Sequence, residues 1–313
     1  EGWVDYRAVV SEDGKSWLRV PTEYKDGELK ISYRPAGDSI SVAYFAPYSF
    51  ERHEALLDCS SGEPGVDRIH LGLTLDGRPL DGLVIDPVEG SEPARTAWII
   101  ARQHPGETMA EWWVEGFLAR LLDANDAVAV SLRRAMRFYV VPNMNPDGSV
   151  RGHLRCNALG ANLNREWETP TPERSPEVLV VRDAMDRTGV DFCLDVHGDE
   201  ALPYNFISAA EGIPGWSPRL SELTERFKEA YEISNPDFQR VHGYPLDAPG
   251  EGNLTMASNQ ISQRYDCLAM TLEMPFKDNA DAPDPEQGWS PARSRQLGRS
   301  VIDAIAAVEP SLR

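Results

Sequence analysis

The sequence has fewer basic than acidic residues: 31 Lys and Arg against 50 Asp and Glu give a net charge of −19. Proteins that bind nucleic acid gain much of their affinity from basic surface that displaces counterions from phosphates, so the acidic excess argues against that role. Long hydrophobic runs are also missing. The longest, at 96–101 and 138–142, fall far short of the roughly 20 residues that a membrane span requires. We therefore expect neither nucleic acid nor a membrane as a partner.

Cysteine is scarce as well. The four cysteines lie far apart and form no CxxC pair: Cys59, Cys156, Cys193 and Cys267. A zinc cluster or a disulfide framework needs closer or more numerous cysteines, so we expect free thiols in a reducing cytoplasm. No secretory signal pattern follows Glu1, and no repeat of about 20 to 50 residues indicates a solenoid or propeller. With 41% hydrophobic residues, the composition is that of a globular protein with a sizeable core.

The pattern of the sequence changes along the chain. Residues 17–45 alternate between apolar and polar side chains, which predicts short antiparallel strands. Residues 49–58 then read as a helix that begins with a capping serine, and residues 69–85 as a hairpin around an Asp-Gly turn. Apolar strand candidates follow, alternating with helical patterns at 108–123, 176–187, 217–230 and 291–307. We predict a small antiparallel β-domain over residues 1–45, followed over residues 46–313 by an α/β domain whose mixed, mostly buried β-sheet is flanked by helices.

His104 and Glu107 stand between a strand and a helix, in the segment ARQHPGET. In α/β sheets, sites tend to lie at the carboxyl ends of strands. On a Pro-Gly turn, an imidazole and a carboxylate three residues apart can converge on one cation, and zinc accepts both. In isolation, the same pair is also typical of a surface histidine beside a glutamate at a helix start.

A second buried strand, FCLDV, is also followed by a histidine, His197. The imidazoles of His197 and His104 can therefore meet above one edge of the sheet. Two histidines and one glutamate, with a fourth position for water, form the ligand set of a catalytic zinc. Asp195 or Asp199 could orient an imidazole, and a solvated carboxylate explains each equally well. The alternative for His197 is a hydrogen-bonded histidine at a strand end.

Glu273 is the only charged residue of the apolar strand LAMTLEM. A lone carboxylate in a buried strand is costly unless it is paired or acts beside a metal. Beside the predicted zinc site, we interpret Glu273 as a general base rather than as one half of a structural ion pair.

The segment 143–175 has little regular pattern, and inside a compact domain such a long loop is usually functional. It contains Arg151, Arg155, and Asn164 next to Arg165. Guanidinium forks bind carboxylates in bidentate fashion and stabilise oxyanions, as a site for a terminal carboxylate requires. For each arginine, a surface or ion-pair role explains the position equally well.

Five short motifs occur in one order along the chain: HPGE, NPDG, NxNR, DxHG and TLEMPF. In this order they resemble the zinc metallocarboxypeptidase family, and most closely its cytosolic carboxypeptidase subfamily, which includes deglutamylases and bacterial members. The resemblance runs from about Ala46 to Arg313. The segment YFAPYSFERH and the strands before it resemble the junction with that subfamily's small β-domain.

The resemblance implies a carboxypeptidase-like fold and hydrolysis of the C-terminal peptide bond of peptides or proteins. It assigns one zinc ion to three ligands, His104, Glu107 and His197. The metal would activate a water molecule, with Glu273 as the general base. The same resemblance gives Arg155 the task of polarising the scissile carbonyl, and Asn164 and Arg165 that of binding the terminal carboxylate.

The active-site tyrosine of the family is missing from its usual place, because the stretch PGEGNLTMASNQ before Glu273 contains none. Tyr244 and Tyr265 lie on either side of this stretch, and the sequence favours neither. Arg240 and Arg264 could recognise an acidic side chain, as the resemblance to deglutamylases suggests.

Two other functions fit parts of the pattern. Deacylases related to aspartoacylase, which act on small N-acyl amino acids, share the metal arrangement and an LNR segment, but HPGE followed by NPDG favours the peptidase. A catalytically silent module for binding C-termini would usually have lost a ligand or the base, and here all are present. The expected substrates are therefore peptide or protein C-termini.

Overall fold

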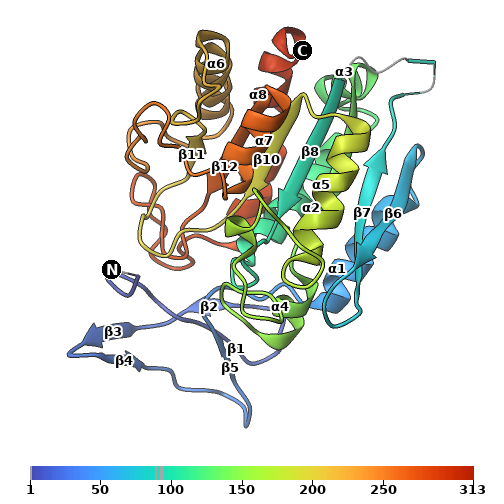
Figure 1. Cartoon of the computed structure of the whole chain (residues 1–313). Coiled ribbons are helices and arrows are strands. Elements are labelled where there is room, and N and C mark those ends of the chain that lie inside the picture. The colour runs from blue at the N-terminus through green and yellow to red at the C-terminus, as the bar shows by residue number, and fades with distance from the viewer. Residues whose placement is uncertain (1, 89, 92–94) are drawn as a thin grey trace.

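A seven-stranded mixed β-sheet forms the centre of the chain in the computed structural model, which describes residues 2–88, 90–91 and 95–313 (Figure 1). The strand order is β11-β12-β10-β8-β9-β7-β6. The four strands from β12 to β9 in this order are parallel, and the other three pair antiparallel with their neighbours. The strands are β6 (Val66–Leu73), β7 (Pro79–Ile85), β8 (Arg95–Ala101), β9 (Met136–Val141), β10 (Phe192–Val196), β11 (Phe206–Ala209) and β12 (Leu268–Glu273).

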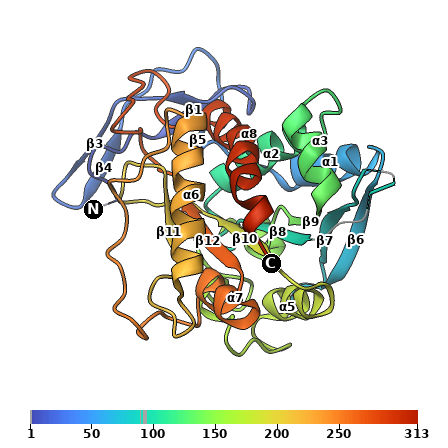
Figure 2. The ribbon, with the colours of Figure 1, turned by 90° about the horizontal axis from the view of Figure 1, so that it is seen from above.

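Helices cover both faces of this sheet, and each face has its own hydrophobic cluster. The larger cluster lies under α1 (Phe50–Ser61), α2 (Met109–Leu121), α3 (Ala127–Ala135), α6 (Pro218–Ser234) and α8 (Pro291–Val308). The smaller one lies under α5 (Pro176–Thr188) and α7 (Ala257–Tyr265), which Figure 2 shows on the opposite side from α2 and α8. Burial on both faces explains why the central strands are continuous apolar runs.

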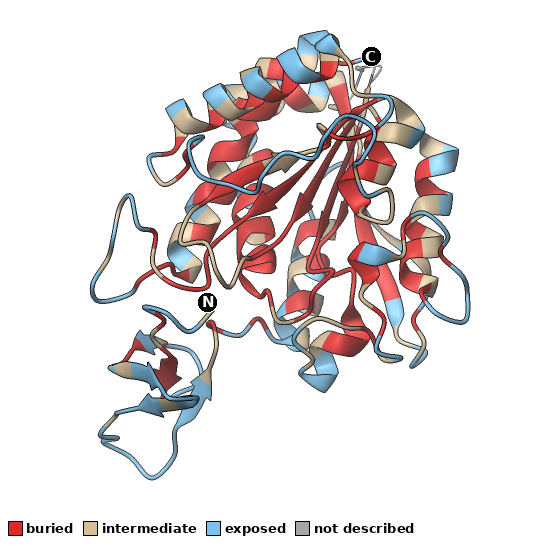
Figure 3. Cartoon of the chain, turned by 60° about the vertical axis from the view of Figure 1, so that its left-hand side comes forward, coloured by how far each residue is buried: buried red, intermediate tan, exposed pale blue. Residues whose placement is uncertain are grey.

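Residues before the sheet form smaller elements of their own. Strands β1 (Val9–Ser11), β2 (Leu18–Arg19) and β5 (Ser41–Ala43) make a three-stranded antiparallel sheet, and β3 (Thr22–Lys25) pairs with β4 (Glu28–Ile31). Most of this part is exposed, unlike the central strands (Figure 3). Arg19 is buried and ties it to the rest of the chain by donating to the carbonyls of Phe276 at 2.7 Å and Trp289 at 3.0 Å. The boundary at residue 45, which falls between β5 and α1, stays a prediction.

The predicted helices and strands of the central layer are confirmed, including the Ser49 cap of α1, whose side chain accepts from the Arg52 amide. Three helices were missed: α3, α4 (Pro146–Arg151) and α7. α4 and the 3-10 turn Leu163–Arg165 lie in the segment predicted to lack regular structure, and asparagine side chains cap both. Within the described ranges, no helix is long and apolar enough to cross a bilayer.

Candidate metal centre

Three neighbouring parallel strands bring the predicted site residues to one edge of the sheet. Val196 at the end of β10 pairs with Ala101 at the end of β8 and with Leu272 in β12. His197 follows directly, and its amide donates to the Leu272 carbonyl at 2.8 Å. Because parallel strands end at the same edge, the turn after β8, His197 and Glu273 all meet there, near α4 and the N-terminal strands (Figure 1).

The side chains of His104, Glu107 and His197 converge on one point and are all buried. The two carboxylate oxygens of Glu107 lie 2.7 Å from Nδ1 of His104 and 2.8 Å from Nδ1 of His197. The two Nδ1 atoms lie 3.2 Å apart. Ligands of a tetrahedral zinc with bonds of about 2.0–2.1 Å lie roughly 3.3 Å from one another. The spacing therefore suits one such ion.

The other nitrogen of each imidazole indicates which tautomer the ring adopts. Nε2 of His197 lies 2.8 Å from the Asp195 carboxylate, and Nε2 of His104 lies 2.9 Å from Oδ1 of Asn162. Both partners are acceptors, so each Nε2 carries the proton and each Nδ1 keeps its lone pair. Two lone pairs and a carboxylate that face one another are the donor set of a cation site, so these residues fit zinc.

Charges around these ligands raise the pKa of His197 and lower that of Glu107. Burial disfavours a charged His197, but the Asp195 and Glu107 carboxylates outweigh it and raise the pKa of His197 well above its ordinary value. Burial opposes ionisation of Glu107, yet His104 and His197 lower the pKa of Glu107 far below its usual range. The cluster thus holds the carboxylate in the ionised form that a metal requires.

Gln103 connects the centre to the loop that follows β9. Its side-chain amide donates to Asp195 at 2.6 Å and accepts from the Trp167 indole at 2.7 Å. Its main-chain carbonyl accepts from the Asn145 side chain at 3.0 Å. Gln103 and Asn162 were not predicted from the sequence, in which the signal for each is its place inside ARQHPGET or NLNR.

Glu273 ends β12 beside these ligands and is 7% exposed. Among the described residues, its Oε2 atom has no hydrogen-bond partner. Burial raises the pKa of Glu273 well above its usual value and outweighs the opposing effect of His197. A buried carboxyl with an open oxygen beside a metal site can accept and return a proton.

The polar residues of the loop after β9 differ in how far they are buried and in which groups their side chains contact. Asn164 is buried, and its Oδ1 accepts from the Ala257 amide at the start of α7 at 2.8 Å. Arg165 is exposed, and its pKa is lowered by partial burial and by the neighbouring Arg155. Neither Arg155 nor Arg165 forms an ion pair within the part of the chain that the structure describes. Arg151 differs, since it pairs with Asp76 at the surface.

The structure places Tyr244, not Tyr265, at the site. The Tyr244 ring packs edge-on at 5.0 Å against Phe206, which pairs with Glu273 across β11 and β12. Its hydroxyl donates to Asp199 at 2.5 Å. Burial, then Glu273 and Asp199, raise the pKa of Tyr244 far above its usual value, so the hydroxyl keeps its proton. Tyr265 instead donates to Asp186 at the surface.

The two arginines considered for acidic side chains already have carboxylate partners. Arg264 pairs with Asp186 at 2.8 Å and Arg240 with Glu232 at 2.9 Å. Both pairs are partly exposed to solvent. Part of each guanidinium is therefore already engaged by a carboxylate of this chain.

Comparison with known proteins connects this geometry to a family. Residues 58–280 match the model of the zinc carboxypeptidases, and residues 1–45 match the N-terminal domain of cytosolic carboxypeptidases. A metallo-carboxypeptidase from Pseudomonas aeruginosa, solved with (2-guanidinoethylmercapto)succinic acid, is 46% identical with a TM-score of 0.96, covering 100% of this chain and 82% of its own. One from Burkholderia cenocepacia is 48% identical with a TM-score of 0.94, covering 99% and 82%.

A curated relative agrees. Cytosolic carboxypeptidase 6 of Caenorhabditis elegans is 26% identical over 86% of this chain, which spans 62% of that protein's length. The fold, with its mixed sheet and small N-terminal sheets, is the one that the family resemblance implied. The match over residues 58–280 covers most of the sequence, and the chain belongs to the zinc carboxypeptidase family of hydrolases.

Proposed function

We propose that this chain removes C-terminal residues from peptides or proteins as a zinc-dependent carboxypeptidase, with the metal held by His104, Glu107 and His197. The observation that carries the proposal is the convergence of two imidazole lone pairs and one carboxylate beside the open oxygen of Glu273. Zinc bound there would polarise the scissile carbonyl and acidify a water molecule. Every other step falls to side chains of the chain itself.

Glu273 serves as the general base. Its Oε2 takes the proton of the attacking water and returns it to the departing amine, so no covalent intermediate with the protein is needed. Burial, which raises the pKa of Glu273, supports this exchange because it makes the carboxyl a better proton acceptor. Arg155 stabilises the charge that develops on the carbonyl oxygen, a role supported by its lack of a carboxylate partner among the described residues.

Arg165 and Asn164 bind the terminal carboxylate of the substrate. The contact between Asn164 and the first amide of α7 fixes the position of its side chain, and Arg165 donates to the Asn164 carbonyl at 2.6 Å. Two neighbouring guanidinium groups without acidic partners favour an anion between them. The succinic acid derivative in the P. aeruginosa complex suggests a probe that could occupy such a site here.

Two finer points belong to the same proposal. An acidic C-terminal preference, for which Arg240 and Arg264 are candidates although each already pairs with a carboxylate of the chain, is tested by comparing cleavage of C-terminal Glu with that of C-terminal Leu. We also propose a cytoplasmic location, which the names of the cytosolic relatives support.

The experiment compares a peptide with a free C-terminus, its C-terminal amide, and an N-acetyl amino acid as substrates. We expect cleavage of the free acid only. Arg165→Ala should lower kcat/KM for the free acid about ten- to hundredfold, since a charge-assisted contact is lost. Arg151→Ala, in the same loop but paired with Asp76, is the matched control and should change little. Good cleavage of the amide would contradict the proposal, and preference for the N-acetyl amino acid would favour an aspartoacylase-like amidohydrolase.

A further inference from the structure

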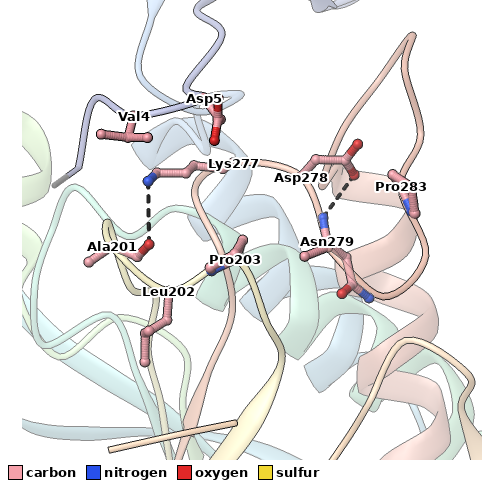
Figure 4. Close-up of a pocket in the computed structure, with 10 residues that line it drawn as sticks. Val4, Asp5, Ala201, Leu202, Pro203, Lys277, Asp278, Asn279 and Pro283 are labelled. Atoms are coloured by element: carbon pink, nitrogen blue, oxygen red, sulfur yellow. Dashed lines mark hydrogen bonds between the residues drawn. The ribbon is translucent and has the colours of Figure 1, made fainter.

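A cavity of about 480 Å³ lies where the N-terminal arm meets two loops of the central domain. Val4 and Asp5 form one wall, Ala201–Pro203 a second, and residues 277–280 with Pro283 the third (Figure 4). The lining side chains are mostly apolar: Val4, Ala201, Leu202, Pro203, Ala280 and Pro283. A cavity of this size and character can hold a large apolar side chain.

The two loops that line the cavity begin at the metal centre. Ala201 follows His197 by four residues and Lys277 follows Glu273 by four, so each Cα lies at most about 14 Å from the site residue before it. Glu200 lies between the two sites: burial and then Glu107 raise the pKa of Glu200, while Arg155 lowers it. A Cβ placed on Gly2 would lie 3.4 Å from Cβ of Glu200, so the N-terminal arm touches this same residue.

The cavity and the predicted carboxylate-binding residues lie on opposite faces of the sheet. Asn164 is tied to the start of α7, which packs on the smaller cluster. Lys277 lines the cavity, and the residue before it, Phe276, belongs to the larger cluster and stacks at 4.4 Å on Tyr44 of the N-terminal part. A peptide whose C-terminus reaches Asn164 must cross the sheet edge at the metal, so its upstream residues leave toward the cavity.

The walls of the cavity are already held in place. The Asp199 carboxylate accepts from the amides of Ala201 and Leu202, both at 2.6 Å, and the Ala280 amide donates to the Pro203 carbonyl at 2.8 Å. The Lys277 ammonium is buried and donates to the Ala201 carbonyl at 3.3 Å (Figure 4). A preformed pocket binds without the entropic cost of ordering its walls.

We propose that this cavity is an upstream subsite, built jointly by the N-terminal arm and the loops after His197 and Glu273, that selects substrates with a large apolar side chain two to four residues before the cleaved bond. This inference rests on the proposed function. Carboxylates at that position are disfavoured, because Asp5 and Asp278 line the cavity beside its apolar residues, and the Lys277 ammonium in the wall already donates to the Ala201 carbonyl. The substrate class is thus a C-terminal tail with an apolar anchor, not a run of acidic residues.

The first test measures kcat/KM for peptides that share one C-terminal dipeptide and carry Leu, Gly or Glu at the second, third, fourth or sixth position upstream. We expect Leu to exceed Gly and Glu by about tenfold or more at one position among the second to fourth, as burial of such a side chain allows, and by little at the sixth. Equal rates for Leu, Gly and Glu at every position would overturn the subsite while leaving the carboxypeptidase intact. No hydrolysis of any peptide, including an N-blocked dipeptide, would instead overturn the proposed function.

The second test introduces a charge into the cavity. Val4→Glu should remove the advantage of the Leu peptide and leave the N-blocked dipeptide unaffected, because the dipeptide does not reach the cavity. Val42→Glu is the matched control, a similarly exposed valine of the N-terminal part that does not line the cavity, and should keep the Leu preference. Leu202→Ala is an independent test, because it removes apolar surface from the cavity wall, and it should reduce the preference for the Leu peptide several-fold. An unchanged Leu preference in both Val4→Glu and Leu202→Ala would exclude this cavity as the subsite.

Discussion

The Asp195 carboxylate lies 2.8 Å from Nε2 of His197, two residues away along one buried strand and its end. This contact points the other ring nitrogen at Glu107 and His104. Asp195 is fully buried and also accepts from Gln103. It therefore acts on the metal through His197, as acceptors behind metal-bound histidines commonly do.

Asp195→Asn should weaken zinc binding about ten- to hundredfold, because the histidine loses the charge that stabilises its protonated Nε2. Competition with a chromophoric chelator measures the affinity. Asp126→Asn, which alters a helix cap and an ion pair with Arg120 outside the metal site, should leave it unchanged. Equal zinc affinity for Asp195→Asn and the parent would show that this contact is merely structural.

Glu273→Gln should retain stoichiometric zinc but lower kcat by two or more orders of magnitude, roughly the contribution of a general base. The amide keeps the shape of the side chain while removing the proton acceptor. Steady-state assays of the zinc-loaded variant, with metal content measured on the same sample, check this. Turnover close to that of the parent would place the base elsewhere.

Arg102→Ala should destabilise the fold by about 3–5 kcal/mol, because the fully buried Glu111 would lose its guanidinium partner and be left with the His53 imidazole as its basic neighbour. Arg102 adopts a positive φ of 57° and donates to the carbonyls of Pro105 and Tyr48, so it also holds the turn that carries His104. Urea unfolding measures the loss. Arg137→Ala, which breaks an exposed pair with Asp86, is the control and should cost within about 1 kcal/mol. A similar loss of unfolding free energy in Arg102→Ala and Arg137→Ala would contradict the claim that the buried pair stabilises the fold more than the exposed pair.

Glu177→Gln should make stability less dependent on pH. Burial, above all, raises the pKa of Glu177 to about 7 from an ordinary value of 4.5. Between pH 4.5 and about 7, Glu177 is ionised in the unfolded chain but protonated in the folded chain. The free energy of unfolding therefore falls as the pH rises through this range, and above pH 7 it stays below its value at acidic pH. The free energy of unfolding of Glu177→Gln, relative to that of the parent, should therefore rise by about 2–3 kcal/mol between pH 5 and pH 8.

Unfolding free energies measured across this pH range test the Glu177 prediction. Exposed Glu173→Gln, from the preceding loop, is the control and should track the parent. A gain for Glu177→Gln that is as large at pH 5 as at pH 8 would assign the effect to packing instead of ionisation.

The convergence of His104, Glu107 and His197 was predictable because parallel strands end together: an apolar run followed by His197 and another followed by the His104 turn meet at one edge. Glu273 could be identified because a lone carboxylate in a buried apolar strand is costly unless it is paired or has a function. The alternation of strands and helices from β8 to β12 follows from the same runs and the helical patterns between them, whereas the order of the strands in the sheet was not predicted. These signals lie within short segments, so a single sequence was enough to recognise them.

What escaped prediction depends on contacts between distant segments. Tyr244 reaches the site only because its loop folds over β11, and sequence distance could not separate it from Tyr265. The helix α7 is largely polar and short, so its pattern was weak, although Ala257 and Ile261 are buried. The cavity at Val4 requires the N-terminal arm to lie against loops about 200 residues and more away along the chain, a juxtaposition that no motif encodes.

The zinc content of the purified chain tests the central claim most directly. Elemental analysis should find one zinc ion per chain in the parent and in the control His242→Ala, whose ring stacks on Tyr204 away from the three ligands. It should find essentially none in His197→Ala, with circular dichroism verifying that the variant is folded. Full retention of zinc by folded His197→Ala, or a parent that binds no zinc when offered it, would contradict the account.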